Sequence, residues 1–140
     1  MKTLTKGLLI LLALLCCVSL AACADVEKTG VWESATYTTD KEFGKGEKTV
    51  TVLVVAEEQT LTFTLHTDKE TLGEALKEHS LIEGDEGPFG IYIKKVNGIL
   101  ADYDVDQTYW SLTKGGELLM VGVDDTEIAD GEQYELTRTK

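Results

Sequence analysis

Three aspartates stand at alternate positions in the second half of the chain, at Asp102, Asp104 and Asp106. Carboxylates at alternate positions can converge on one hard cation, and this spacing opens many calcium-binding loops. The rest of an EF-hand loop is absent, because Gln107 replaces its glycine and Thr113 replaces its glutamate. The same aspartates can instead line a solvated strand edge, where charge blocks unwanted strand pairing. The segment is therefore a candidate calcium site, with a solvated loop as the alternative.

Four aromatic side chains and a serine form a second candidate site. Exposed aromatic rings can stack on a flat ligand or anchor a protein partner. Because neighbouring residues of a strand face opposite sides, Tyr109 and Trp110 cannot both point into the core. Trp110 is favoured as a core residue, while Tyr109 fits a ligand contact and a solvent-facing ring equally well. The candidate ligand-binding residues are Tyr92, Tyr103, Tyr109, Trp110 and Ser111.

Residues that commonly carry catalysis are scarce in this sequence. The two histidines, His66 and His79, end a predicted strand and a predicted helix, and a cation near a helix C-terminus is favoured by the helix dipole. The serines lack the G-x-S-x-G context of a nucleophile elbow. A glycine-rich phosphate loop, paired metal histidines and a Cys-x-x-Cys motif are also missing from the sequence. We therefore expect a protein that is not an enzyme.

The first 22 residues are typical of an export signal. Lys2 and Lys6 precede an apolar run over residues 7–20, and small residues follow it. That run is shorter than the roughly 20 residues that span a bilayer as a helix. The segment Leu20-Ala21-Ala22-Cys23 resembles the lipobox of bacterial lipoproteins, in which the cysteine is acylated and becomes the mature N-terminus. A freely secreted protein with an incidental cysteine is the alternative.

Lipidation of Cys23 would attach the protein to the extracytoplasmic face of the cell membrane. Several acyl chains on one residue anchor stably, whereas a single chain binds only marginally. Cys23 is the one cysteine left after removal of residues 1–22, so the domain has no disulfide and depends on its core.

The acidic composition excludes several classes of partner. The formal net charge is −12, and loss of Lys2 and Lys6 with the signal leaves −14 on residues 23–140. A chain without a basic stripe cannot neutralise phosphates, so nucleic acid is not an expected partner. The same charge opposes binding to anionic lipid, which makes a covalent anchor more necessary.

The expected organisation is a tether followed by one domain. Residues 23–47 contain no sustained apolar period, so we expect a lipidated N-terminus and a flexible tether there. Within it, Trp32 and Tyr37 either dock on the domain as an extra strand or remain exposed. Residues 48–140 form the globular domain.

Hydrophobic patterning predicts an α+β fold. Residues 49–56 and 60–66 are β-branched or alternate in polarity, and they predict a hairpin. Thr67 and Glu70 fit a capping box, and a helical apolar stripe follows them. Glycine-rich turns then separate further strands over residues 91–96, 109–113, 117–123 and 133–139. This order predicts a β-grasp-like fold, with one helix packed on a mixed β-sheet and an additional hairpin.

Several short motifs together resemble the DUF4430 domain. In order, they are Thr71-Leu72-Gly73-Glu74-Ala75-Leu76, Gly90-Ile91-Tyr92-Ile93, Val96-Asn97-Gly98, Tyr109-Trp110-Ser111-Leu112, Gly116-Glu117, Gly122-Val123 and Ile128-Ala129-Asp130-Gly131. The domain is similar to the C-terminal β-domain of transcobalamin and intrinsic factor. The resemblance covers roughly residues 48–139.

The resemblance implies a small-ligand-binding module at the cell surface, of a kind found mainly in Gram-positive gut bacteria. In the vitamin carriers this domain closes over cobalamin held against a large α/α barrel, and the stretch matching residues 109–112 faces the ligand. This chain departs from the carriers in having no barrel. A cobalamin-like corrinoid is the candidate ligand, and a surface transporter component is a candidate partner. The alternatives are a calcium-binding surface protein and an adhesion or accessory module that uses a strand edge.

Overall fold

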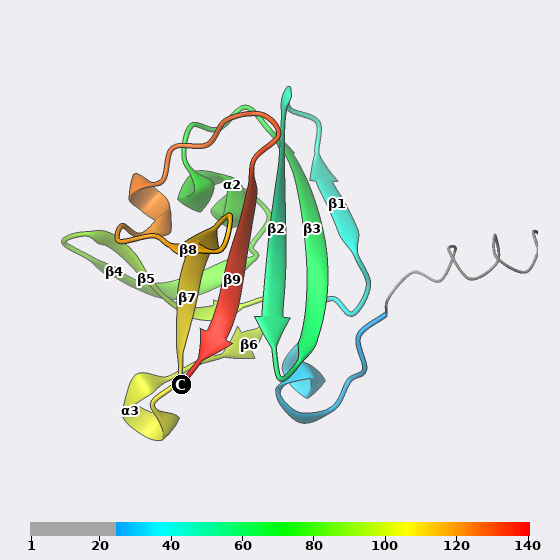
Figure 1. Ribbon diagram of the computed structural model, residues 1–140, viewed down its shortest axis with the longest axis vertical. Helices are drawn as coiled ribbons and strands as arrows, with labels where there is room; N and C mark the ends of the chain where they lie inside the picture. Colours follow the sequence, from blue (N-terminus) through cyan, green and yellow to red (C-terminus); the bar gives the residue numbers. More distant parts are fainter. Residues whose placement is uncertain (1–24) are drawn as a thin grey trace, which may run out of the picture.

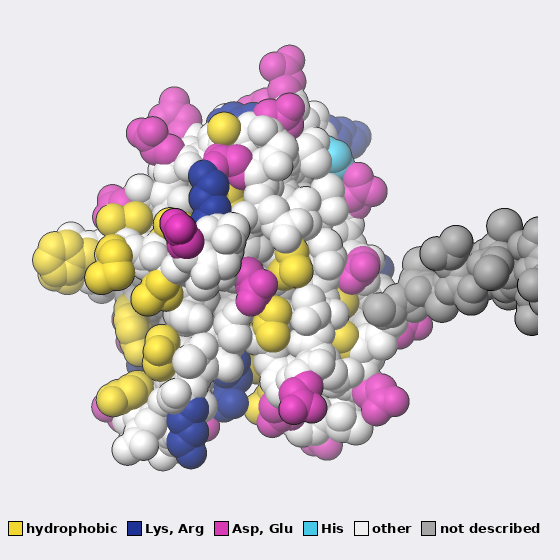
Figure 2. Space-filling view, in the orientation of Figure 1, with side chains coloured by type: hydrophobic (Ala, Val, Ile, Leu, Met, Phe, Trp, Pro, Cys, Tyr) yellow, Lys and Arg dark blue, Asp and Glu magenta, His cyan; other side chains and the backbone are white. Residues whose placement is uncertain are grey.

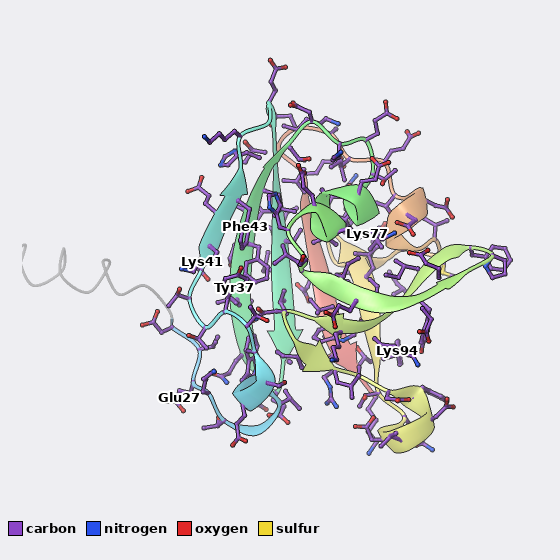
Figure 3. The ribbon with its side chains drawn as sticks, turned by 180° about the vertical axis from the view of Figure 1, so that it is seen from behind. Glu27, Tyr37, Lys41, Phe43, Lys77 and Lys94 are labelled. Carbon is purple, nitrogen blue, oxygen red and sulfur yellow. The ribbon has the colours of Figure 1, made fainter. Side chains whose placement is uncertain are left out.

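The computed structural model of the protein describes residues 25–140. The predicted signal segment and Cys23 therefore lie outside the described residues. Two β-sheets make up the fold (Figure 1): one six-stranded, in the order β1-β3-β2-β9-β7-β8, and one three-stranded, in the order β4-β5-β6. The views from the two sides place helix α2 and the three-stranded sheet over the same face of the six-stranded sheet (Figures 1 and 3).

The predicted hairpin lies at the centre of the larger sheet. Strands β2 (Lys48–Ala56) and β3 (Gln59–Thr67) pair along their whole length, and alternate residues of both are buried. Glu57 and Glu58 connect them, with φ angles of 46° and 66°. Positive φ at both central residues is the requirement of a tight two-residue hairpin turn, so the hairpin is confirmed with a shorter turn than the sequence suggests.

The C-terminal half of the chain completes the six-stranded sheet. Strand β9 (Gln133–Thr139) runs parallel to β2, and β7 (Tyr109–Lys114) runs antiparallel to β9. A short β8 (Glu117–Leu118) follows β7 through a turn at residues 115–116. The sheet thus mixes parallel and antiparallel pairs against one principal helix, which confirms the α+β class.

Helix α2 (Leu72–Glu78) begins four residues later than predicted. Thr71 is its N-cap, and the Thr71 Oγ1 accepts a hydrogen bond of 3.2 Å from the Glu74 backbone N–H. Thr67 is instead the last residue of β3. The prediction of a capping box at Thr67 and Glu70 is therefore wrong, because the Thr-x-x-Glu spacing occurs twice in succession and the hairpin pairing includes Thr67, the first residue of the first copy.

The three-stranded sheet contains a strand that the sequence does not predict. Strand β4 (Ile82–Gly87) pairs with β5 (Gly90–Val96), which pairs with β6 (Ile99–Leu100). All residues of β4 after Ile82 are exposed, so the strand has no apolar alternation to reveal it. The predicted turn at Asn97-Gly98 is present, with positive φ at both residues.

The N-terminal part of the described chain packs on the domain. It forms a 3₁₀ helix, η1 (Gly30–Ser34), and strand β1 (Lys41–Gly44), which pairs parallel to β3. Trp32 is fully buried, and its Nε1–H donates a hydrogen bond of 2.9 Å to the Ala56 carbonyl. Tyr37 and Phe43 (Figure 3) contact edge to face, with ring centroids 5.4 Å apart, and both rings also contact Phe63 of β3 edge to face.

The prediction of a flexible tether is therefore wrong for residues 25–47. Apolar contacts in this segment are spaced irregularly, at Val26, Trp32 and Ala35, so no helical or strand period marks them in the sequence. The docking alternative for Trp32 is the correct one, although the residue lies in a 3₁₀ helix rather than in a strand.

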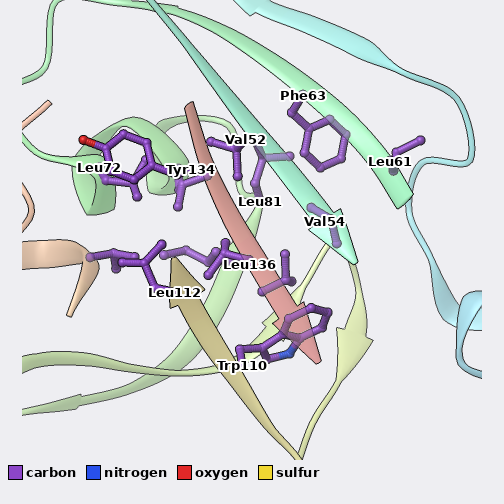
Figure 4. Packing of buried hydrophobic residues seen from close by; sticks show 14 of the residues in the cluster. Val52, Val54, Leu61, Phe63, Leu72, Leu81, Trp110, Leu112, Tyr134 and Leu136 are labelled. Carbon is purple, nitrogen blue, oxygen red and sulfur yellow. The ribbon is translucent and has the colours of Figure 1, made fainter. Parts of the chain in front are cut away.

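One continuous core fills the space between the sheets and α2 (Figure 4). Side chains from β2, β3 and β9 meet those of α2 and β7, and Tyr134 is buried among them with its hydroxyl donating to the Glu127 carbonyl at 3.3 Å. The remaining elements are α3 (Tyr103–Asp106) and the 3₁₀ helix η2 (Val123–Asp125). Among residues 25–140, no helix has the length and apolar character needed to cross a membrane.

Candidate ligand-binding site

An open cavity of about 310 Å³ lies between β5, β7 and the segment that follows β8. All of its lining residues are uncharged, and most are apolar or aromatic. An uncharged and largely apolar lining favours ligands that present apolar surface, because it offers no ionic partner to a charged group that loses hydration there. The lining residues are Ile91, Tyr92, Ile93, Tyr109, Trp110, Ser111, Leu112, residues 118–123 and Leu136.

The structure brings four of the five predicted ligand-binding residues to this cavity. Tyr92 projects from β5, while Tyr109, Trp110 and Ser111 are consecutive in β7. Tyr103 lies outside the lining, on α3, with 57% of its surface exposed. Tyr103 is close to Tyr109 in sequence, but it belongs to helix α3 rather than to β7 and does not line the cavity.

Strand alternation decides how the two aromatic residues of β7 differ. Trp110 is 9% exposed and belongs to the core, and its Nε1–H donates to the Lys94 carbonyl at 3.3 Å. Tyr109 is 39% exposed. The expectation that Trp110 is a core residue is confirmed. Tyr109 is partly exposed, which fits both of its alternatives, and both residues border the cavity.

The segment after β8 is a part of the site that the sequence does not predict. Its prediction as a strand over residues 117–123 is wrong beyond Leu118, because only Glu117 and Leu118 pair with β7. Leu118, Met120 and Val121 are 60%, 90% and 51% exposed, which is unusual for large apolar side chains so close together. The unbroken apolar run was the available signal, since a half-buried strand alternates.

A second exposed apolar element stands beside this segment. Phe89, at the tip of the β4–β5 hairpin, is 86% exposed, and its carbonyl oxygen would lie 3.9 Å from a Cβ placed on Gly122. Figure 2 shows apolar side chains gathered along the side of the molecule that carries the β4–β5 hairpin tip and β8. The cavity therefore opens within a wider apolar surface.

A polar contact outside the cavity joins its walls. The Asp124 carboxylate in η2 accepts hydrogen bonds from the Lys77 Nζ at 3.0 Å and from the Ile91 backbone N–H at 2.8 Å. Lys77 also lies 3.3 Å from the Glu86 carboxylate on β4. Added Cβ atoms at Gly73 or Gly90 would overlap Asp124, so both positions need glycine for this close approach.

Lys77 and Asp124 shift each other's pKa. The hydrogen bond to Asp124 raises the pKa of Lys77 above its usual value. Burial alone would raise the pKa of Asp124, but the hydrogen bonds from Ile91 and Lys77 outweigh it and leave that pKa lowered. Both groups are therefore charged over the whole neutral range, and the contact persists there.

The structure does not bring the three predicted calcium ligands together. Asp102 caps α3 by accepting from the Asp104 backbone N–H at 3.1 Å. Asp106 accepts from the Thr108 backbone N–H at 3.1 Å and from the Arg138 guanidinium at 3.0 Å. The hydrogen bond from the Thr108 hydroxyl is the main reason why the pKa of Asp106 is lowered. In the part of the chain that the structure describes, no cluster of three or more His, Cys, Asp or Glu side chains is placed to hold a metal ion.

Both histidines lie beside β1 rather than at the cavity. The His66 Nε2 is 2.6 Å from the Glu42 carboxylate, and its Nδ1 is 3.1 Å from the Thr49 hydroxyl. His79 stacks on Phe43, with ring centroids 5.1 Å apart. These contacts hold the N-terminal segment against the sheet and give the histidines a structural role.

Comparison with known proteins identifies the family of the chain. The DUF4430 family, described as a domain of unknown function, matches residues 69–139. The chain belongs to this family, as its motifs indicate. No curated protein matches the chain.

The solved structures that are similar to this one include the following two. One is a protein of Ruminococcus gnavus ATCC 29149 proposed to bind metal, with 37% sequence identity and a TM-score of 0.64; the match covers 67% of this chain and 98% of that one. The other is haptocorrin in complex with Cbi, with 26% identity and a TM-score of 0.51. It covers 70% of this chain and 26% of haptocorrin, and it confirms the resemblance to the transcobalamin family.

Proposed function

We propose that this protein is a non-catalytic binding module that takes a small, flat and largely apolar ligand into the cavity between β5, β7 and residues 118–123. The observation that carries the proposal is an uncharged cavity bordered by the half-exposed rings of Tyr92 and Tyr109. Its volume of about 310 Å³ lies at the lower end of the range of small-molecule sites, roughly 300–1,000 Å³. Aromatic rings at the mouth can stack on a planar ligand without requiring charge.

A corrinoid is the first candidate ligand. Support comes from the similarity to haptocorrin, whose structure contains Cbi. A corrin ring is larger than the cavity, so one edge of the ring would enter it and the rest would lie against Phe89, Met120 and Val121. Because this chain covers 26% of haptocorrin, it supplies one side of such a site, and we expect affinity in the micromolar range or weaker.

An absorbance titration tests this function. Dicyanocobinamide has intense visible absorption bands, and transfer of one face of the ring from water onto aromatic side chains should shift them on mixing with the purified protein. Saturable shifts would support the proposal. A flat titration with protein at several hundred micromolar would reject a corrinoid as the ligand.

Metal binding is the second candidate function, because the similar R. gnavus protein is proposed to bind metal. The segment Asp102 to Asp106 is the place that the sequence favours. Calcium there would have to replace the hydrogen bonds that Asp102 and Asp106 make with the backbone and with Arg138. Calorimetry with calcium chloride should give a binding heat that disappears in Asp104→Ala, and an unchanged heat would clear these residues of the role.

We further propose that Cys23 is lipidated and that the domain is held on the extracytoplasmic face of the cell membrane of a Gram-positive bacterium. The packing of the N-terminal segment sharpens this proposal. The Val26 backbone N–H already donates to the Thr38 carbonyl at 2.9 Å, and Val26 is buried. A domain that begins this close to Cys23 would lie against the membrane rather than at the end of a long tether.

The mass of the protein extracted from membranes tests the anchor. A mature N-terminus at Cys23 that carries acyl mass would support lipidation, and an unmodified cysteine would refute it. A surface transporter component remains the proposed kind of partner for a captured ligand.

We also propose that the topology is β-grasp-like. The β2–β3 hairpin is followed by α2, and the last strand, β9, enters the sheet parallel to β2. In this arrangement β7 follows β9 in the sheet and lies near the edge that ends with β8, and the cavity forms beside β7.

A further inference from the structure

The outer edge of β7 is only partly covered. Strand β8 pairs with it at two positions, Lys114 with Glu117 and Thr113 with Leu118. One more hydrogen bond follows, from the Leu119 backbone N–H to the Leu112 carbonyl at 2.9 Å. The chain then bends away from the sheet. Within residues 25–140, no strand covers this edge from Tyr109 to Ser111.

The direction of the backbone groups of β7 follows from the hydrogen bond that the Leu112 carbonyl accepts from Leu119. Successive residues of an antiparallel strand direct their N–H and C=O groups alternately to the two neighbours. The Leu112 carbonyl points to the β8 side, as its bond to Leu119 shows, so the backbone groups of Trp110 point to the same side. Both the N–H and the C=O of Trp110 are therefore directed at the uncovered edge, where the described residues offer them no backbone partner.

The cavity runs along this edge. Four consecutive residues, 109 to 112, line it. Side chains of a strand alternate between the two faces, so a space that all four residues border reaches the edge of the strand. Because Leu136 of β9 also lines it, the space extends from this edge over the face of the sheet as well. Four residues of strand are about 13 Å long. Apolar residues 91–93 and 118–123 form the other walls. The space thus has the length, the free donor and acceptor, and the apolar walls that an added strand requires.

We propose that β7 accepts an extended peptide segment of another protein, which adds to the six-stranded sheet in line with β8. Strand addition obtains affinity from main-chain hydrogen bonds and specificity from pockets for alternate side chains. Here the segment pairs with Trp110 and places every second side chain in the cavity, so it carries uncharged apolar residues at alternate positions. This inference goes beyond the proposed small-molecule function and does not depend on it. The two occupants share the cavity and therefore exclude each other.

Amide hydrogen exchange measured by NMR tests the edge itself. In the purified protein, the Ser111 and Thr113 amides pair with β9 and should exchange slowly, whereas the Trp110 amide should exchange at least about tenfold faster although its side chain is nearly buried. Slow exchange at Trp110 in the free protein would show that the edge is covered and would overturn the proposal.

A synthetic peptide of sequence Ac-Thr-Val-Thr-Val-Thr-Val-amide then serves as the probe. At millimolar concentration it should slow exchange of the Trp110 amide by about tenfold or more. N-methylation of the central valine and of the neighbouring threonine provides matched controls, because in a paired strand only one of these amides faces β7. One methylated peptide should lose binding and the other should retain it. Equal behaviour of the two, or no protection at Trp110, would overturn strand addition.

Two protein variants test whether the peptide binds in the cavity. Met120→Lys adds a charge at the cavity wall on a side chain that is 90% exposed, and it should weaken peptide binding about tenfold. Val105→Lys is the control, because Val105 is 80% exposed on α3 and lies outside the cavity lining. Equal effects of the two substitutions would contradict the proposed position. Binding of dicyanocobinamide without binding of the peptide would reject strand addition and leave the proposed function intact. Binding of the peptide without binding of dicyanocobinamide would reject a corrinoid as the ligand and support strand addition.

Discussion

Lys77 of α2 and Asp124 of η2 lie 47 residues apart in the chain, and the Lys77 Nζ is 3.0 Å from both oxygens of the Asp124 carboxylate. The same carboxylate accepts from the Ile91 backbone N–H at the start of β5. Because Ile91 and Val123 both line the cavity, the shape of an uncharged site depends on an ion pair outside it. Figure 3 shows Lys77 extending from α2 toward η2.

Removing the Asp124 carboxylate should loosen both walls of the cavity. Asp124→Ala leaves the Ile91 N–H without its acceptor and is expected to lower the free energy of unfolding by about 1–3 kcal/mol. Urea denaturation measures this change. Asp125→Ala is the control, since Asp125 is the exposed neighbour and its loss should cost less than about 0.5 kcal/mol. Equal losses in the two variants would mean that the Lys77–Asp124 contact does not hold the walls.

The raised pKa of Tyr134 predicts how the free energy of unfolding responds to alkaline pH. Burial, together with the Glu132 carboxylate, raises the pKa of Tyr134 to about 12 in the folded protein. An unfolded tyrosine has a pKa of about 10, so the folded state binds the phenolic proton more tightly. The contribution of this protonated tyrosine to the free energy of unfolding is fully present below pH 10 and is lost as pH rises from about 10 to 12.

The Tyr134→Phe variant removes this titration. Its free energy of unfolding should fall less steeply than that of the wild type between pH 10 and 12, as measured by urea denaturation at a series of pH values. A remaining decline is expected from Lys77, whose raised pKa makes its contribution disappear in the same alkaline range. Parallel curves for the two proteins would rule out Tyr134 as a source of the alkaline loss.

Trp32 should be necessary for the stability of the domain. Its side chain is fully buried beneath the β2–β3 hairpin and donates to the Ala56 carbonyl. Trp32→Ala is expected to cost about 3–5 kcal/mol, the usual loss for a large buried aromatic side chain. Thermal or urea unfolding measures it. A loss below about 0.5 kcal/mol would show that residues 25–47 are dispensable, as a tether would be.

The packed N-terminal segment also predicts an orientation on the membrane, which rests on the proposed lipidation of Cys23. Lys41 lies in β1, close to the start of the described chain, while the β4–β5 hairpin tip lies on the opposite side of the domain (Figures 1 and 3). Energy transfer from a dye at Lys41→Cys to acceptors in a vesicle should therefore exceed transfer from a dye at Phe89→Cys. Equal transfer from the two positions would indicate a freely rotating domain.

Much of the sheet can be predicted from the sequence, for a local reason. Residues 49–56 and 60–66 form strands because β-branched residues alternate in a hairpin, and the turns at Asn97-Gly98 and Gly115-Gly116 adopt the positive φ angles that their residue types favour. Strand β4 escapes prediction because its side chains face solvent. The N-terminal segment escapes because burial of Trp32 depends on a distant hairpin, and no periodicity reports that contact.

Some residues of the candidate site can likewise be predicted from the sequence, and others cannot. Tyr109, Trp110 and Ser111 could be grouped in advance because they are consecutive in one strand, and Tyr92 lies in a strand that crosses them. Proximity in sequence also groups Tyr103 with them, but the structure places it on α3, outside the cavity lining. The apolar run at residues 118–121 is visible in the sequence, but its place in the cavity wall and the Lys77–Asp124 contact result from packing between segments far apart in the chain.

If the cavity beside β7 binds the ligand, loss of an aromatic ring from its wall should weaken binding, and a titration of dicyanocobinamide into two tyrosine variants measures this. Tyr109→Ala removes a ring from the cavity wall, and Tyr103→Ala removes a more exposed ring that lies outside it. We predict that the absorbance shift weakens about tenfold or more in Tyr109→Ala. It should remain at the wild-type value in Tyr103→Ala. An unchanged titration in Tyr109→Ala, or equal losses in both variants, would contradict this assignment.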